Sequence, residues 1–156
     1  MFRLYSPAFS EGGPIPRAHT CDAADLSPPL AWAEIPPGTV ELALIVDDPD
    51  APNGNWVHWV LYGISPKVSG LSAGVPRDAD LKSPIVARQG VNDFRLTGWG
   101  GPCPPPGPAH RYVFTLYAVS QETRTLPRAS KAVLLAAIKN VVVGEARLTG
   151  KYGRSS

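Results

Sequence analysis

The stretch "HRYVFTLYAVS" (residues 110–120) is the clearest β-strand candidate in the chain, and it directly follows the proline-rich segment "GPCPPPGPA" (101–109). Aromatic and β-branched residues favour a pleated strand. Proline fixes φ and removes a backbone donor, so the preceding segment should be a stiff loop rather than a helix. Such a loop is either a rigid surface linker or one wall of a site.

Two other runs have the same strand character, "VELALIVDD" (40–48) and "WVHWVLYGI" (56–64). Weaker candidates are 2–5, 30–32, 85–87 and 146–150. About seven strands separated by Pro and Gly predict a mainly β domain of two packed sheets with long loops. One helix is expected over 130–140, with Ser130 as N-cap and an apolar face of Leu134, Ala137, Ile138 and Val141.

Length and composition predict one domain over 1–156 that folds unaided. Hydrophobic residues make up 44% and charged residues 18%, and the net charge of +2 comes without a basic cluster, which argues against nucleic-acid binding. No secretory or membrane-spanning apolar run is present, so a cytoplasmic protein is expected. The two cysteines lack the Cys-x-x-Cys spacing of zinc and redox sites.

Polar residues continue the apolar rows of the three strong strands, because residues two apart share a face. Asp48 ends the row Leu42, Leu44 and Val46; the second row is Trp56, His58, Val60 and Tyr62; the third is His110, Tyr112, Phe114 and Leu116. A polar group on an inward row costs free energy unless it is hydrogen-bonded or lines a cavity. These groups are therefore either separately satisfied core residues or parts of one site.

Three motifs, "DDPDAP" (47–52), "WVHW" (56–59) and "GPCPPPGPAHRY" (101–112), resemble the phosphatidylethanolamine-binding protein family, in its bacterial and archaeal branch of Raf kinase inhibitor-like proteins. The segments "HTCDAADLSPPLAW" (19–32), "NDF" (92–94) and "LTGKYGR" (148–154) extend the resemblance over nearly the whole chain. It implies an antiparallel β-sandwich with a small cavity for phosphate-like groups of phospholipid headgroups, nucleotides or phosphorylated residues.

The resemblance also implies which residues form the cavity. The ligand-binding set is Asp48, Pro52, Trp56, His58, Gly101, Cys103, Pro104, His110 and Tyr112. Backbone N–H groups near Gly101 and two imidazoles that can become cationic would serve as donors to an anion. Asp48 would repel an anion directly, so we expect it to orient or charge a neighbouring imidazole. Asp50 and Arg111 are either a structural ion pair between the two loops or solvated surface charges.

The family's usual role implies a binding protein without cofactor or metal that acts on a kinase or another signalling partner. A serine-protease inhibitor acting through the least constrained loop, 69–89, is an alternative. A hydrolase or metalloenzyme built on the His/Asp cluster, or on Cys103 with His110, is a weaker one. Cys21 and Cys103 can form a disulfide, although free thiols are the default in a reducing cytoplasm. Two features stay open: Tyr152 either caps the cavity or is only a strand residue, and Arg95 stands where relatives commonly carry glycine.

Overall fold

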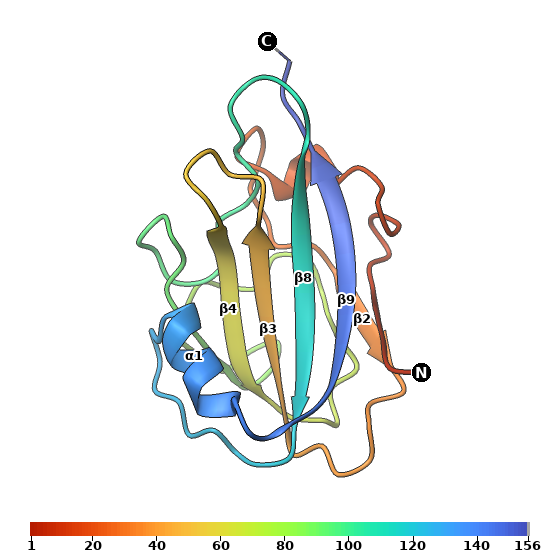
Figure 1. Ribbon diagram of the computed structural model, residues 1–156, viewed down its shortest axis with the longest axis vertical. Coiled ribbons are helices and arrows are strands. Elements are labelled where there is room, and N and C mark those ends of the chain that lie inside the picture. The colour runs from red at the N-terminus through yellow and green to blue at the C-terminus, as the bar shows by residue number, and fades with distance from the viewer. Residues whose placement is uncertain (156) are drawn as a thin grey trace.

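Two antiparallel sheets pack against each other in the computed structural model, which describes residues 1–155 (Figure 1). The larger sheet has the strand order β6 (Asp80–Leu81), β7 (Ala87–Gln89), β4 (Trp56–Ile64), β3 (Glu41–Asp48), β8 (His110–Val119) and β9 (Val142–Tyr152). The smaller sheet has the order β1 (Arg3–Tyr5), β2 (Leu30–Ala33) and β5 (Gly70–Leu71). The predicted mainly β, antiparallel sandwich is confirmed.

The three strong runs of the sequence are the three central strands. The bounds of β4 agree with the prediction, and β3 and β8 each differ from it by one residue at one end. The C-terminal strand β9 is longer than its apolar core of 146–150, because it pairs along the whole length of β8. The two-residue strands β5 and β6 were not predicted, since two residues are too few to show an alternating pattern.

The main core lies between the two sheets. The larger sheet contributes Leu42, Leu44, Val46, Trp59, Leu61, Phe114 and Leu116, and the smaller sheet contributes Leu4, Leu30, Trp32 and Leu71. All of these side chains are buried. Full burial of a large aliphatic or aromatic side chain contributes roughly 1.5–3 kcal/mol. The core therefore holds the central strands, and with them the strand ends that carry the polar residues.

A β-bulge in β4 changes which residues share a face. Val46 on β3 pairs with Trp59, whereas the next residue, Asp47, pairs with Val57, so His58 has no partner on β3. An extra residue of this kind reverses the alternation beyond it. The predicted row from Trp56 to Tyr62 is therefore wrong beyond His58: Trp59 enters the main core, and Tyr62 lies on the opposite face.

The one α-helix within residues 1–155, α1 (Lys131–Ile138), covers that opposite face and lies beside β4 in Figure 1. The Ser130 hydroxyl caps it by accepting a hydrogen bond of 3.2 Å from the Val133 N–H, as predicted. Leu134 and Ile138 are buried against the sheet, whereas Ala137 of the predicted apolar face is exposed.

A 3-10 turn, η1 (Arg17–His19), precedes the loop that carries Cys21. In residues 1–155, no helix has the length and apolar character needed to cross a membrane.

Candidate functional site

A cavity of about 190 Å³ opens at the upper end of the larger sheet in Figure 1, where β3 ends and where β4 and β8 begin. Its lining residues are Asp48, Ala51, Pro52, Asn53, Trp56, His58, Phe94, Cys103, Pro104, Pro105, His110 and Tyr112. Eight of the nine predicted ligand-binding residues are among them. The exception is Gly101.

Asp48 and His110 form a buried carboxylate–imidazole pair. The Asp48 Oδ2 atom lies 2.7 Å from His110 Nδ1, and its Oδ1 atom accepts a 2.8 Å hydrogen bond from the Asp50 N–H. Because a carboxylate only accepts, Nδ1 of His110 carries a hydrogen and Nε2 is left for other partners. Asp48 thus orients an imidazole rather than facing a ligand with both oxygens free, which is the arrangement expected from the sequence.

His58 is held through the same ring nitrogen as His110, but its partner is a neutral carbonyl instead of a carboxylate. Its Nδ1 donates a 2.5 Å hydrogen bond to the carbonyl of Gly100, and its side chain is buried. Burial lowers the pKa of His58, and the Gly100 carbonyl and Asp48 oppose that shift only in part. In the neutral ring that this shift favours, the hydrogen is on Nδ1 and Nε2 accepts hydrogen bonds. Burial therefore opposes the cationic donor form that was expected for His58.

Tyr112 contributes a hydroxyl with no protein partner. Its ring lies edge-on to His58, with 5.2 Å between the ring centroids, and the residue is 1% exposed. Among the described residues, nothing hydrogen-bonds to its hydroxyl oxygen. Burial, followed by the charge of Asp48, raises the pKa of Tyr112, so the hydroxyl keeps its hydrogen at neutral pH. A buried, unpaired hydroxyl on a cavity wall is costly unless it meets a ligand or water.

Gly101 serves packing rather than anion binding. Its N–H donates a 3.0 Å hydrogen bond to Asp25 Oδ1, so it is not available to a ligand. A Cβ at this position would lie 2.1 Å from that carboxylate oxygen and 2.4 Å from the His19 carbonyl, so only glycine fits. Pro102 and Pro104 have no N–H, whereas Cys103 between them does. The predicted role of the Gly101 N–H as a donor to an anion is therefore wrong.

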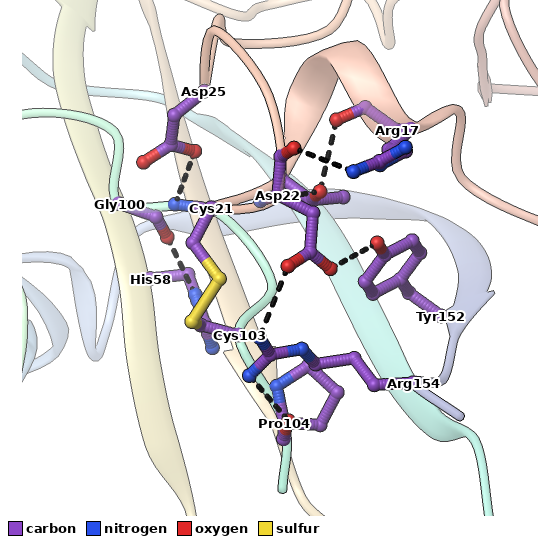
Figure 2. The surroundings of a disulfide bond; sticks show 12 residues. Arg17, Cys21, Asp22, Asp25, His58, Gly100, Cys103, Pro104, Tyr152 and Arg154 are labelled. Carbon is purple, nitrogen blue, oxygen red and sulfur yellow. Dashed lines mark hydrogen bonds and ion pairs between the residues drawn. A yellow bond between two sulfur atoms is a disulfide. The ribbon is translucent and has the colours of Figure 1, made fainter. Parts of the chain in front are cut away.

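A disulfide between Cys21 and Cys103 joins the loop after η1 to the cavity wall (Figure 2). The sequence left these residues open between free thiols and a bridge, and the structure has the bridge. Cys103 in this form has no thiolate, so it cannot act as a nucleophile with His110.

Asp22 reinforces the same connection. It accepts a hydrogen bond from the hydroxyl of Tyr152 and pairs with Arg154 at 3.1 Å (Figure 2). Tyr152 is absent from the cavity lining. Of the two roles left open for Tyr152, capping the cavity is therefore not seen, and its hydroxyl instead anchors the Cys21 loop.

Asp50 and Arg111 are in contact at the rim of the site. The Asp50 carboxylate accepts hydrogen bonds from the Arg111 backbone N–H, Nε and Nη2 at 2.9, 2.9 and 2.8 Å. These bonds lower the pKa of Asp50 to about 2. The pair ties the loop after β3 to the start of β8, and both side chains remain partly exposed.

Four lining residues were not predicted: Ala51, Asn53, Phe94 and Pro105. Phe94 matters most, because its ring lies edge-on to both Trp56 and His58, with 5.4 Å between centroids in each case. The "NDF" motif of the resemblance could have identified it. The following residue, Arg95, adopts a left-handed φ of 65°, so the turn forms despite the missing glycine.

The segment 69–89 is more constrained than expected. It contains β5, β6 and β7, and the buried Gln89 side chain donates to the carbonyls of Pro76 and Asp78 at 2.7 and 2.9 Å. The description of 69–89 as one loop is therefore wrong, and the stretch 82–86 is an exposed part of it between strands.

No group of three or more His, Cys, Asp or Glu side chains within residues 1–155 is arranged to hold a metal ion.

Comparison with known proteins gives a consistent result. A family model described as "Phosphatidylethanolamine-binding protein" matches residues 5–153. A Methanothermobacter thermautotrophicus protein named UPF0098 protein is 46% identical over 97% of this chain and 98% of its own length. A Chlamydia trachomatis crystal structure titled as a phosphatidylethanolamine-binding protein homologue has a TM-score of 0.89 at 36% identity, covering 99% of this chain and 98% of that one. A Mycobacterium tuberculosis protein whose name describes a lipoprotein, LppC, is 40% identical over 96% of this chain and 71% of its own length.

Proposed function

Because this chain belongs to the phosphatidylethanolamine-binding protein family, we propose that it is a non-catalytic binding protein whose cavity holds a phosphate-bearing group. The observation that carries the proposal is the buried Tyr112 hydroxyl, which has no protein partner among the described residues and lines the cavity together with two histidines. A phosphate oxygen supplies the acceptor that this hydroxyl lacks.

The chemistry of the lining supports a small anion. Tyr112 donates through its hydroxyl, and His110 donates through Nε2 when it carries a second hydrogen. No Lys or Arg is among the lining residues within the described chain, so a single phosphate should bind weakly, with a Kd on the order of 1 mM. The cavity volume of about 190 Å³ is below the roughly 300–1,000 Å³ of pockets for drug-sized ligands. The phosphate would therefore be held inside, and the rest of a lipid headgroup, nucleotide or phosphorylated protein outside.

Binding is favoured over catalysis by what the lining contains. Within the described residues it offers no serine, threonine or lysine nucleophile, and Cys103 is in a disulfide. A hydrolase reading would need a water activated by His58 or His110. Release of p-nitrophenol from p-nitrophenyl phosphate, abolished in His110→Ala, would contradict the binding proposal.

A ligand panel tests the proposal directly. Inorganic phosphate, phosphoethanolamine, a nucleoside monophosphate and a phosphoserine peptide are added to the protein, and the thermal midpoint is followed. A ligand that binds only the folded state stabilises it by RT ln(1 + [L]/Kd), or about 1.4 kcal/mol at tenfold excess over Kd. We expect the wild type to gain stability with at least phosphate and the His110→Ala variant to gain none. No gain with any phosphorylated compound would reject the proposal.

Protein partners are the second part of the proposal. A kinase or another signalling protein would present a phosphorylated residue to the cavity, so its binding should be lost in His110→Ala. A serine-protease inhibitor would instead use an exposed segment, and the stretch 82–86 is the best placed. Inhibition of a serine protease that survives His110→Ala but is lost on substitution of 82–86 would favour the inhibitor.

The proposed compartment is the cytoplasm. The Cys21–Cys103 bridge provides a sharp test, because disulfides are rare in reducing cytoplasm outside hyperthermophiles. Cells would be fractionated with immediate alkylation of free thiols, and the two cysteines examined by mass spectrometry. Recovery of the bridged protein from a surface or periplasmic fraction would place it with its lipoprotein-named relative instead.

A further inference from the structure

We propose that the cavity selects a phosphomonoester or phosphonate that keeps one acidic hydrogen, and that it discriminates against phosphodiesters and sulfate. The inference rests on the proposed function, since it concerns the same cavity, and it narrows the ligand class. It follows from the hydrogen-bonding directions of three side chains.

His58 is a fixed acceptor. Its Nδ1 lies 2.5 Å from the Gly100 carbonyl oxygen, which has no hydrogen to give, so the ring hydrogen must be on Nδ1. The residue is 2% exposed, and its ring lies between Phe94 and Tyr112, with centroid distances of 5.4 and 5.2 Å. A second hydrogen on Nε2 would place a cation at this buried position, where the cost of desolvation outweighs the attraction of the carboxylates of Asp48, Asp47 and Asp25. A ligand therefore meets a lone pair at His58.

Tyr112 and His110 differ from His58, because each can donate a hydrogen bond to a ligand. Tyr112 has a hydroxyl that keeps its hydrogen, and His110 has its Nδ1 hydrogen directed at Asp48, 2.7 Å away. An oxyanion beside His110 Nε2 would hold a second hydrogen there. These three side chains thus offer up to two donors and one acceptor, and the amide of Asn53 in the lining can add either kind.

A ligand without a hydrogen cannot satisfy that acceptor. A fully deprotonated phosphate or a sulfate would direct an oxygen lone pair at the lone pair of His58, inside a cavity that already contains the Asp48 carboxylate. A singly protonated phosphate donates its P–OH hydrogen to His58 Nε2 and accepts from Tyr112 and His110. Hydrogen bonds of this kind orient the bound group as well as hold it.

Phosphomonoesters, phosphodiesters and sulfate differ in whether they carry such a hydrogen. A phosphomonoester has a second pKa near 6, so a large share of it is singly protonated in mildly acidic to neutral solution. A phosphodiester has one negative charge but no P–OH group, and sulfate has neither hydrogen nor a comparable pKa. The cavity should therefore prefer a free phosphomonoester, such as a phosphorylated side chain, over the diester phosphate of a membrane phospholipid.

The charged groups around His58 set the conditions of the test. They are Asp48 and Asp47 from β3, His110 and Tyr112 from β8, and Asp25 from the loop that contacts the Gly101 backbone. Asp50 and Arg111 at the rim neutralise each other. The experiment must therefore separate a hydrogen carried by the ligand from one carried by the protein.

The first measurement compares methyl phosphate with dimethyl phosphate and sulfate at pH 6, by calorimetry or by histidine NMR on the wild-type protein. The expected result is at least tenfold tighter binding of methyl phosphate than of the other two. Equal binding of methyl and dimethyl phosphate would overturn the inference and leave the proposed function intact. Absence of binding by methyl phosphate and by inorganic phosphate would overturn both.

The second measurement identifies whose hydrogen matters. Two phosphonates of different acidity are titrated across pH, and the midpoint at which affinity falls is recorded. If the ligand supplies the hydrogen, the midpoint moves with the acidity of the phosphonate. A midpoint that stays fixed would assign the pH dependence to the protein and overturn the inference.

A variant checks the role of His58 itself. His58→Asn keeps a side-chain N–H within reach of the Gly100 carbonyl but removes the acceptor at the Nε2 position. Once its fold is verified by thermal unfolding, we expect the preference for methyl phosphate over dimethyl phosphate to shrink below threefold. An unchanged preference would contradict the assignment of the acceptor to His58.

Discussion

The carboxylate of Asp48 lies 2.7 Å from Nδ1 of His110, and both residues line one small cavity at the strand ends. This pairing fixes the hydrogen on Nδ1 and gives His110 the orientation in which Nε2 can meet a ligand. Asp48 therefore acts on an anion through His110.

Replacement of Asp48 by Asn should weaken phosphate binding about tenfold, by analogy with metal-binding histidines, whose affinity falls at least that much when the hydrogen-bond partner is removed. The matched control is Asp47→Asn. It removes the same charge one residue away, where Asp47 pairs with Lys131 at 3.0 Å and lies outside the cavity lining. Calorimetric titration with phosphate should show the loss in the first variant only. An equal change in both would point to long-range charge and contradict the role of the pair.

Replacement of Tyr112 by Phe should change stability and binding in opposite directions. The variant removes a buried hydroxyl that has no protein partner, so the free energy of unfolding should stay unchanged or rise by up to about 1 kcal/mol. Phosphate affinity should fall, because the hydroxyl is a donor of the cavity. Thermal unfolding and phosphate titration measure the two effects.

Tyr62→Phe is the control for that comparison. The Tyr62 hydroxyl donates to the Leu126 carbonyl at 2.5 Å and accepts from the Ala129 N–H at 3.1 Å. Its loss should cost about 1–3 kcal/mol of unfolding free energy and leave phosphate binding intact. If Tyr112→Phe destabilised the protein as much as Tyr62→Phe, the Tyr112 hydroxyl would have to be paired.

Reduction of the Cys21–Cys103 bridge should weaken both the fold and the site. The cysteines are 82 residues apart, and the chain-entropy relation gives about 4.5 kcal/mol for closing a loop of that length. Both residues are exposed, so a thiol reductant can reach them. We expect a lower urea midpoint and weaker phosphate binding after reduction, and the same in the Cys21→Ser/Cys103→Ser variant. Two titratable thiols with unchanged unfolding would contradict this.

The Asp50–Arg111 pair should give a stability contribution with a defined pH window. The pKa of Asp50 is about 2 in the folded protein and near 3.9 in an unfolded chain. The contribution is therefore fully present above about pH 5 and is lost progressively as pH falls through the folded-state pKa of about 2. The difference in urea unfolding between the wild type and Asp50→Asn should shrink steadily from pH 5 to pH 2. A difference of the same size at pH 5 and at pH 2 would exclude the ion pair as its source.

Two kinds of feature could be predicted from the sequence: strands with a clear residue pattern, and cavity residues that belong to recognisable motifs. Runs of β-branched and aromatic residues predicted β3, β4 and β8, because alternating burial fixes strand periodicity. The motifs around Asp48, His58 and His110 predicted most of the cavity, since all three lie at strand ends on one side of the sheet.

The remaining features depend on pairing in three dimensions. The bulge at His58 cannot be predicted from the residue pattern of β4 alone, because a bulge is defined by how β4 pairs with β3. The use of the Gly101 N–H by Asp25, 76 residues away in sequence, cannot be read from the loop itself. The state of Cys21 and Cys103 depends on distance and redox conditions, neither of which the spacing reveals.

The most direct test of the phosphate-binding proposal is a ¹H–¹⁵N NMR titration of the histidine side chains with inorganic phosphate at pH 6. His19 provides an internal control, because it is buried, hydrogen-bonded through Nδ1 to the Leu26 carbonyl at 2.9 Å, and outside the cavity lining. We predict saturable shifts of the His58 and His110 resonances while His19 stays unchanged. Resonances of His58 and His110 that do not move, or that move only in parallel with His19, would contradict the phosphate-binding cavity.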